Sequence, residues 1–275
     1  MNDDPARVPT DLQRDLAAEL WDADRTAVPI APLTERHPDL VLADAYAIQT
    51  INIDRRVAEG QRVIGRKVGL TSKPMQKLLG VDEPDFGVLT ETMVVEDGDE
   101  VDLATLVQPR VEAEMAFVMG RDLAGPGVTT GTALAAIAGV LPAIEIVDSR
   151  VADWKIKLVD TVADNASSGL IVTGGRMTPL AHIDLRLVGV VVSRGGEVLH
   201  TGAGAAVLGN PARCVAWLAN TLGAFGAGLR EGDIILPGSP HAMVAVAPGD
   251  VFRAEFAHLG PVTVRFSRHN SEEAA

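Results

Sequence analysis

The chain has 275 residues, of which 47% are hydrophobic and 22% charged, and its formal net charge is −13. These proportions are typical of a folded globular protein with a sizeable core, and they exclude a disordered chain. The excess of acidic residues argues against nucleic acid or an anionic membrane as a partner, because both bind faces rich in lysine and arginine.

A single cysteine, Cys214, rules out an internal disulfide framework and a thiolate metal cluster. It lies on the apolar side of a predicted helix, where we expect an inert buried thiol. Residues 1–15 are polar and acidic and lack the pattern of a secretory signal. The longest apolar run, residues 133–144, is too short to span a bilayer. We therefore expect a cytoplasmic protein.

Residues 1–62 predict an N-terminal helical segment. The first helix follows a start signal at Thr10 and Asp11, and the second covers about residues 44–59 and ends at Gly60. Because apolar side chains that recur every three or four residues share one helix face, each helix should bury one side. The expected buried residues are Leu12, Leu16, Leu20 and Trp21 in the first helix, and Tyr46, Ile53 and Val57 in the second.

Short β-branched runs separated by turn residues dominate residues 63–275, which we expect to form a mixed β catalytic domain. Two helices interrupt this region, at about residues 130–138 and from a cap at Asn210 to about Gly223. Because strands outnumber helices and do not alternate with them, we predict an α+β fold with a mixed, strongly bent β-sheet core. Strands are predicted at residues 111–119, 144–147, 185–192, 243–246, 251–256 and 262–266.

Glu112 and Glu114 occupy alternate positions of one predicted strand. Their side chains therefore point to one face, with Cα atoms about 7 Å apart. The neighbouring Val111 and Ala113 point the other way, into apolar surroundings. Two carboxylates on one face repel each other unless a cation lies between them. A pair with this spacing is also typical of a solvated strand face, so the pair alone leaves both interpretations open.

A third acid, Glu145, lies within the apolar run 141–147, where an unpaired charge is costly. No basic residue follows it in the sequence before Arg150. Three carboxylates that converge on one hard cation would satisfy all three acids. Ligation by oxygen atoms alone indicates Mg²⁺ or Mn²⁺, with water or substrate in the remaining coordination positions.

Three further polar segments are candidates for the same site. Lys67 lies on a short run between glycines, where a ligand can approach the backbone, although a lone lysine is usually a surface residue. Asp85 belongs to an acidic, turn-rich loop that is equally typical of solvated surface. Residues 160–169 are dense in small polar groups that form caps and turns or orient a substrate carboxylate. His182, His200, His241 and His258 are scattered and show no metal-binding spacing.

Together these segments resemble the 2-keto-4-pentenoate hydratase family, within the fumarylacetoacetate hydrolase superfamily. The resemblance implies the C-terminal fold of that superfamily and covers nearly all of the chain from about Leu42. The matching stretches are residues 65–71, 80–87, 108–114, 140–168, 204–218 and 232–236.

The resemblance implies a hydro-lyase of aromatic-compound catabolism in the meta-cleavage pathway, acting after ring cleavage. The substrate would be 2-hydroxypenta-2,4-dienoate (2-keto-4-pentenoate) or a substituted relative, and the product a 4-hydroxy-2-oxo acid. A homo-oligomer is implied, and a pathway decarboxylase or aldolase is a candidate partner. The implied residues are Glu112, Glu114 and Glu145 as ligands of Mg²⁺ or Mn²⁺, Lys67 and Asp85 for proton transfer, and Ser167, Asp164 and Asn165 for substrate binding.

Two alternatives remain open. The 4-oxalocrotonate decarboxylases share the three glutamates but tend to carry other residues around Lys67, Asp85 and Trp154, where this chain is similar to the hydratases. Pro237 departs from the family pattern and leaves the substrate size open. A non-catalytic, metal-binding member of the fold is the second alternative, against which the intact Lys67 and Asp85 argue.

Overall fold

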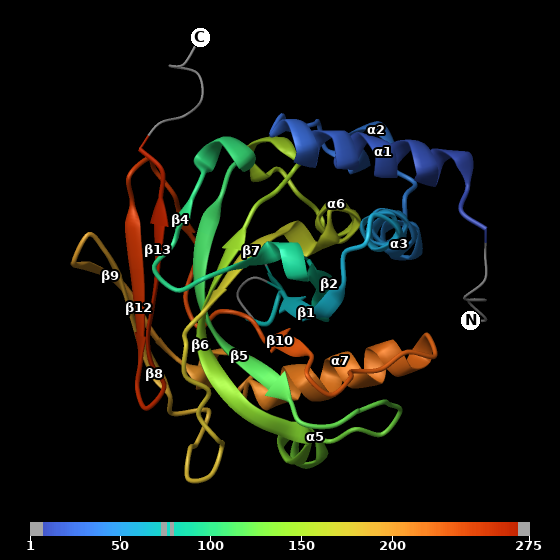
Figure 1. The fold of residues 1–275 in the computed structure, drawn as a ribbon. Coiled ribbons are helices and arrows are strands. Elements are labelled where there is room, and N and C mark those ends of the chain that lie inside the picture. Colours follow the sequence, from blue (N-terminus) through green and yellow to red (C-terminus); the bar gives the residue numbers. More distant parts are fainter. Residues whose placement is uncertain (1–7, 73–75, 78–79, 269–275) are drawn as a thin grey trace.

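Two long antiparallel strands, β5 (Arg110–Met119) and β6 (Ile137–Val147), form the centre of the fold (Figure 1). The structure is a computed structural model that describes residues 8–72, 76–77 and 80–268. Val111 and Ala113 of β5 are completely buried. The apolar second half of β5 is buried as well, which makes it an interior strand, as its sequence predicted.

An eight-stranded sheet surrounds this pair in the order β2-β1-β10-β5-β6-β7-β3, and β11 pairs with β5. The pairs β1/β10 and β3/β7 are parallel, whereas the other pairs are antiparallel. Figure 1 shows the sheet curling into a half-barrel, so the predicted mixed and strongly bent sheet is confirmed. The remaining strands of this sheet are β1 (Val63–Gly69), β2 (Asp85–Thr90), β3 (Val94–Val95), β7 (Ser168–Thr173), β10 (Ile234–Leu236) and β11 (Val244–Ala245).

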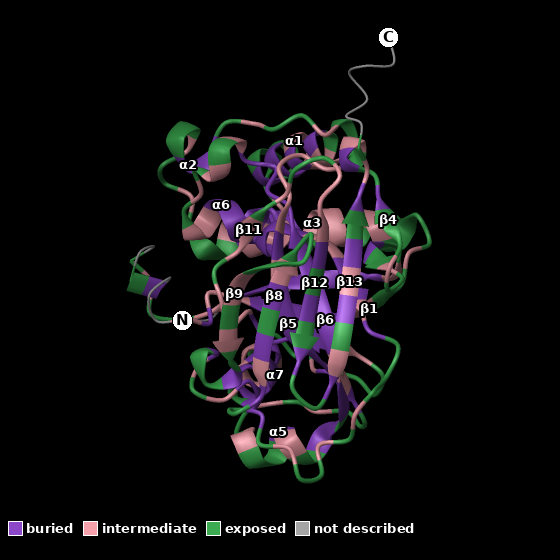
Figure 2. Ribbon diagram, turned by 90° about the vertical axis from the view of Figure 1, so that its left-hand side faces the viewer, coloured by how far each residue is buried: buried purple, intermediate pink, exposed green. Residues whose placement is uncertain are grey.

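A five-stranded sheet, in the order β4-β13-β12-β8-β9, lies beside the outer face of β6 (Figures 1 and 2). Side chains of β12 alternate between exposed and buried, and Phe252 and Phe266 pack edge to face with ring centroids 6.1 Å apart. The predicted strand 185–192 begins only at Gly189. The strands are β4 (Glu100–Val101), β8 (Gly189–Arg194), β9 (Glu197–Ala203), β12 (Val251–Phe256) and β13 (Gly260–Phe266).

The N-terminal helices pack against one another and against α6 (Leu158–Ala163) (Figure 1). Thr10 caps α1, as predicted, and Leu16 and Leu20 are buried. Leu12 and Val57 were predicted to be buried but are 41% and 47% exposed, because each helix turns a narrower face inward than its apolar residues suggested. The boundary at residue 62, between the helical segment and the β domain, stays a prediction. The helices are α1 (Asp11–Thr26), α2 (Leu33–Arg36) and α3 (Leu42–Ala58).

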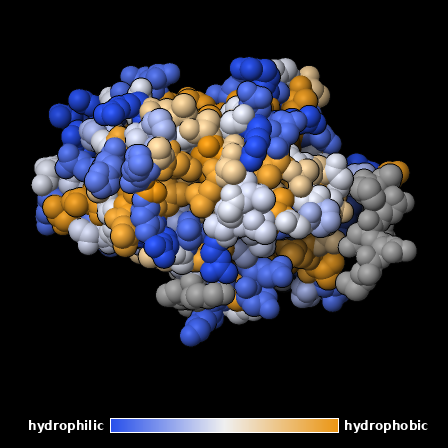
Figure 3. All heavy atoms as spheres, turned by 90° about the horizontal axis from the view of Figure 1, so that it is seen from below, coloured by the Kyte–Doolittle hydropathy of each residue, from blue (hydrophilic) through white to orange (hydrophobic). Residues whose placement is uncertain are grey.

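Two further helices, α5 (Thr130–Ala136) and α7 (Ala212–Ala224), lie together at the lower end of the molecule in Figure 1. The space-filling view from below shows hydrophobic patches between hydrophilic side chains (Figure 3). The predicted burial of Cys214 and of the apolar face of α7 is confirmed. The predicted helix 130–138 is wrong at its end, since β6 already begins at Ile137. The 3₁₀-helices are Glu91–Met93, Leu103–Thr105, Ala152–Trp154, Asn165–Ser167 and Gly204–Ala206.

No helix within the described ranges has the length and hydrophobicity of a membrane span.

Gly65 of β1 lies so close to the backbone of β10 that only glycine fits at this position. A Cβ atom at this position would lie 1.8 Å from the Ile234 carbonyl oxygen. We expect Gly65→Ala to lower the free energy of unfolding by about 2 kcal/mol or more, because a backbone atom must move. Urea unfolding measures this loss. Gly175→Ala is the matched control, because a Cβ there meets nothing within 4 Å. Equal unfolding midpoints for the two variants would contradict the prediction.

Candidate active site

The three predicted metal ligands converge on one face of the β5/β6 pair. Glu112 of β5 and Glu145 of β6 are register partners across the two strands. Glu114 lies two residues further along β5, so its side chain points to the same face. One carboxylate oxygen from each glutamate lies within 4.8 Å of the others. This spacing allows a single cation to contact all three acids.

Burial makes the ionised forms of Glu112 and Glu114 less favourable. Glu114 and Glu145 are buried, and Glu112 is half-buried. Burial, together with the charge of Glu145, raises the pKa of Glu112 to about 7. The same causes raise the pKa of Glu114 well above its usual value. The Gly238 backbone N–H donates a hydrogen bond of 2.7 Å to Glu114 Oε2 and opposes part of this shift.

Lys67 of β1 provides a buried cation beside the cluster. Its Nζ lies 3.2 Å from Glu145 Oε1, an oxygen that accepts no well-formed hydrogen bond from the described residues. Burial alone would lower the pKa of the Lys67 ammonium group, but Glu145 and the neighbouring carboxylates raise it above its usual value. One ammonium group cannot balance three glutamates and Asp85. The oxygen-only donor set and its excess negative charge therefore fit Mg²⁺ or Mn²⁺.

Asp85, at the start of β2, approaches the backbone of β1. A Cβ atom at Gly69 would lie 2.1 Å from Asp85 Oδ1, so only glycine leaves room for this carboxylate. Within the described residues, Asp85 Oδ1 is buried without a hydrogen-bond partner. Burial raises the pKa of Asp85, and the Lys67 charge opposes this shift. A carboxyl group in such a position is suited to exchange protons.

Ser167 lies on a turn with an unusual backbone. Asn165, Ala166 and Ser167 all have φ values of 52–53°, in the left-handed region. A left-handed residue other than glycine costs about 1–2 kcal/mol, so the surroundings must hold this turn in place. The Ser167 hydroxyl lies 3.2 Å from Thr161 Oγ1 and 3.4 Å from Asp164 Oδ2.

Asp164 and Asn165 have partners within the protein. The Asp164 carboxylate pairs with Arg150, and the Asn165 side chain exchanges hydrogen bonds of 2.7 and 2.9 Å with the Val88 backbone. These bonds attach the turn to β2 and to the segment after β6. The predicted contact of the two side chains with substrate stays a prediction.

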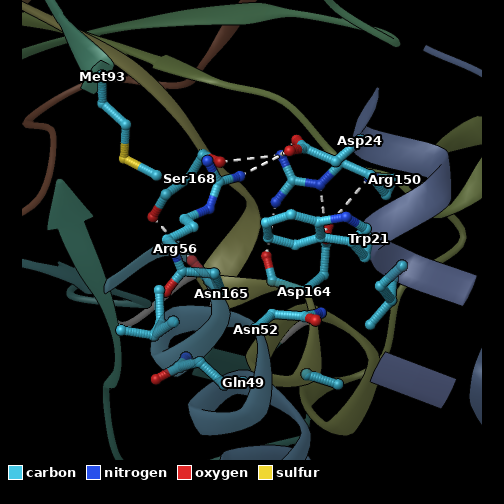
Figure 4. Close-up of a pocket in the computed structure, with 13 residues that line it drawn as sticks. Trp21, Asp24, Gln49, Asn52, Arg56, Met93, Arg150, Asp164, Asn165 and Ser168 are labelled. Carbon is cyan, nitrogen blue, oxygen red and sulfur yellow. Dashed lines mark hydrogen bonds and ion pairs between the residues drawn. The ribbon is translucent and has the colours of Figure 1, made fainter. Parts of the chain in front are cut away.

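A small pocket, open to solvent, lies on the helical side of this turn (Figure 4). Trp21, Asp24 and Arg56 line one part of it, and Asp164, Asn165 and Ser168 another. The pocket includes none of the three glutamates. Its charged residues, Asp24, Arg56, Arg150 and Asp164, pair with one another.

Trp154, a position at which this chain is similar to the hydratases, packs at the beginning of β5. Its Nε1 donates a 3.1 Å hydrogen bond to the Gln108 carbonyl, and the Arg110 guanidinium group lies 4.5 Å from its ring centroid. It therefore supports the strand that carries two of the glutamates.

Three contributions to the site escaped the sequence analysis. They are the Gly238 N–H to Glu114, the buried Arg150 behind the turn, and His241, whose Nε2 accepts a 3.0 Å hydrogen bond from the Ala113 N–H. His241 thus supports the backbone of β5 between Glu112 and Glu114. The signal that could have revealed Arg150 is a basic residue immediately after an apolar strand.

Comparison with known proteins places this site in a family. The profile of the family described as fumarylacetoacetate (FAA) hydrolase C-terminal matches residues 52–267. A 2-keto-4-pentenoate hydratase of Paraburkholderia xenovorans (strain LB400) is 50% identical over 267 residues, which cover 97% of this chain and 99% of that protein. A 2-hydroxyhexa-2,4-dienoate hydratase of Comamonas testosteroni is 49% identical over 250 residues, covering 90% and 95% of the two chains.

A solved structure shows the same architecture. The 4-oxalocrotonate decarboxylase from Pseudomonas putida G7, complexed with magnesium and adipate, superposes with a TM-score of 0.91. It is 41% identical, and the match covers 94% of this chain and 99% of that one. The chain therefore belongs to the fumarylacetoacetate hydrolase C-terminal family and, within it, to the group that includes the 2-keto-4-pentenoate hydratases.

Proposed function

We propose that this chain is a hydratase that requires Mg²⁺ or Mn²⁺. It adds water to 2-hydroxypenta-2,4-dienoate, or to a substituted relative, and forms a 4-hydroxy-2-oxo acid in the breakdown of aromatic compounds. The observation that carries this proposal is the convergence of three carboxylates beside Lys67 and Asp85, in a chain half identical to 2-keto-4-pentenoate hydratases.

Glu112, Glu114 and Glu145 are the proposed ligands. Their charges attract a divalent cation, and Lys67 forms an ion pair with Glu145. A bound cation would withdraw electrons from the 2-oxygen end of the substrate and make C4 more electrophilic. The Gly238 N–H donates a hydrogen bond to Glu114 Oε2 and so restrains this carboxylate.

Lys67 and Asp85 are proposed to move the protons. Conversion of the dienol to its 2-oxo-3-enoate form removes the proton of the 2-hydroxyl group and adds one at C5. Addition of water then places hydroxyl at C4 and a proton at C3. Asp85 would accept the proton of the attacking water and return it to C3, and Lys67 would carry the proton of the 2-hydroxyl group to C5. No redox cofactor is required because no electrons are gained or lost.

Ser167 is proposed to hold the substrate, with Asp164 and Asn165 at the same turn. The proposal includes a homo-oligomer in the cytoplasm, with a pathway decarboxylase or aldolase as a candidate partner. Support for self-association comes from exposed hydrophobic side chains such as Leu187 and Phe225, and from the patches in Figure 3.

Decarboxylation is the second candidate function, and the similarity to a 4-oxalocrotonate decarboxylase structure favours it. Asp85 argues for hydration, because the resemblance places an acid at this position in hydratases and not in decarboxylases.

Turnover separates these activities. With Mg²⁺ or Mn²⁺, we expect loss of the dienol absorbance of 2-hydroxypenta-2,4-dienoate and formation of 4-hydroxy-2-oxopentanoate, identified by mass spectrometry. Glu145→Gln should abolish both, because it removes a ligand charge. Release of carbon dioxide from a dicarboxylic 2-oxo acid, without hydration, would establish the decarboxylase. Metal binding without any turnover would establish a non-catalytic protein.

Asp85→Asn tests the proposed base. We expect the hydration rate to fall by a factor of about 10² or more, because the amide cannot accept the proton of water. Mn²⁺ affinity should stay within about twofold, since Asp85 is not a proposed ligand. Steady-state kinetics and calorimetric titration measure the two effects. Asp82→Asn, an exposed acid in the same loop, is the control. Full activity in Asp85→Asn would refute the assigned role.

The raised pKa of Glu112 predicts how stability depends on pH. A carboxyl group whose pKa rises on folding contributes stability below its unfolded value, and this contribution is lost as pH rises through about 7. Metal binding needs the ionised form and should reverse the loss. We therefore expect the Mn²⁺-induced rise in Tm to be larger at pH 8 than at pH 5.5.

The raised pKa of Glu112 also predicts how Mn²⁺ affinity depends on pH. Mn²⁺ affinity should fall by up to about tenfold per pH unit below pH 7 for each proton displaced. Glu112→Gln should weaken this dependence, whereas Glu100→Gln, at an exposed site, should not. An Mn²⁺-induced Tm shift that is the same at both pH values would contradict the raised pKa of Glu112.

A further inference from the structure

Arg150 is a buried cation that the proposed chemistry does not use. It follows β6 and is 5% exposed. Burial alone would lower the pKa of its guanidinium group, but Asp164 and two other aspartates raise it above its usual value. A guanidinium group at such a depth is destabilising unless its donors are satisfied. The positions of the hydrogen-bond partners of Arg150 therefore indicate its structural role.

These partners lie at the two ends of the turn that carries Ser167. Nη2 donates a 2.8 Å hydrogen bond to the Asp164 carbonyl, and Nη1 donates one of 2.9 Å to the Ser168 carbonyl. The three left-handed residues 165–167 lie between these two carbonyls. One planar group thus bridges the turn and fixes the distance between its ends.

Arg150 also orients the carboxylate next to the Ser167 hydroxyl. Its Nε lies 2.5 Å from Asp164 Oδ1, and its backbone N–H donates a 3.0 Å hydrogen bond to Asp164 Oδ2. That same Oδ2 lies 3.4 Å from Ser167 Oγ. The guanidinium group therefore acts on Ser167 both through the backbone and through the Asp164 side chain.

The outer side of Arg150 faces the N-terminal helices. Asp24 of α1 lies between the two arginines, 3.7 Å from Arg150 Nη1 and 2.6 Å from Arg56 Nη2 of α3. Figure 4 shows Arg150 between Asp24 and Asp164, at the edge of the pocket. These contacts connect α1 and α3 to the turn. The Arg150–Asp24 ion pair is longer than the Arg150–Asp164 pair, and Asp24 is partly exposed.

We propose that Arg150 is a positioning residue that holds the left-handed turn 165–167 so that the Ser167 hydroxyl faces the substrate. This inference rests on the proposed function, in which Ser167 binds substrate. Arg150 contacts neither the substrate nor the three glutamates in this account. Its loss should impair substrate binding and leave metal binding unchanged.

A double-mutant cycle tests the inference. Arg150→Lys keeps the charge but cannot bridge two carbonyls and a carboxylate at once. We expect it to lower kcat/KM by about tenfold, mainly through KM, with Mn²⁺ affinity within about twofold of the wild type. In the Ser167→Ala background the same substitution should cost less than about twofold, because the group that Arg150 positions is already absent.

Ala166→Gly provides an independent readout. Glycine adopts left-handed φ without strain, so the turn should need less support. We expect Arg150→Lys/Ala166→Gly to recover at least about threefold of the lost kcat/KM. A merely charge-balancing role for Arg150 would predict no recovery. Asp24→Asn removes the outer ion pair and is the matched control, expected to change kcat/KM by less than about twofold.

Different outcomes test the role of Arg150 and the proposed role of Ser167. Additive effects of Arg150→Lys and Ser167→Ala, or unchanged kinetics of Arg150→Lys, would overturn the positioning role. An unaltered KM in Ser167→Ala would instead remove the substrate-binding role of Ser167. If Arg150→Lys does not fold, failure of Ala166→Gly to restore folded protein would also overturn the inference.

Discussion

The mutual repulsion of Glu112, Glu114 and Glu145 is the constraint on which the site depends. Strand pairing places these side chains on one buried face, where each ionised form makes the others less favourable. Lys67 compensates one of these charges, and Asp85 adds another on the same side. The cluster therefore requires a further cation or bound protons, which couples metal binding to proton release.

Close backbone contacts make this arrangement possible. β10 lies between β1 and β5, and thereby brings Lys67 to a strand pair far along the sequence. Gly69 leaves space for the Asp85 carboxylate, and Gly238, with φ of 103°, presents its N–H to Glu114. A side chain at Gly238 would lie 2.0 Å from Thr71 Oγ1. The shape of the cluster is thus set by backbone geometry as much as by its acids.

Local periodicity was sufficient to predict part of this site. The alternation of Glu112 and Glu114 placed them on one face, and the apolar setting of Glu145 indicated a buried charge in need of a partner. The identity of that partner could not be inferred locally. Lys67 reaches Glu145 only because β10, from the C-terminal part of the chain, joins the two halves of the sheet. The resemblance to a known family supplied the roles of Lys67 and Asp85.

Other errors have equally physical causes. The predicted helix 130–138 is rich in helix-forming alanines, yet its last two residues belong to β6, which pairs with β5, because tertiary pairing outweighs local propensity. The burial of Leu12 and Val57 was overpredicted because helix packing decides which part of an apolar stripe faces inward. Arg150 was missed because its partners, the Asp164 carboxylate and the carbonyls of Asp164 and Ser168, lie 14 to 18 residues further along the chain.

Proton release during Mn²⁺ binding tests the central claim most directly. Calorimetric titration at pH 6.5, in buffers with different ionisation enthalpies, gives both the stoichiometry and the number of protons released. The account predicts one Mn²⁺ per chain and a net release of protons, since burial and the neighbouring carboxylates raise the pKa values of Glu112 and Glu114. Binding without proton release, or binding that persists when Glu112, Glu114 and Glu145 are all replaced by glutamine, would contradict it.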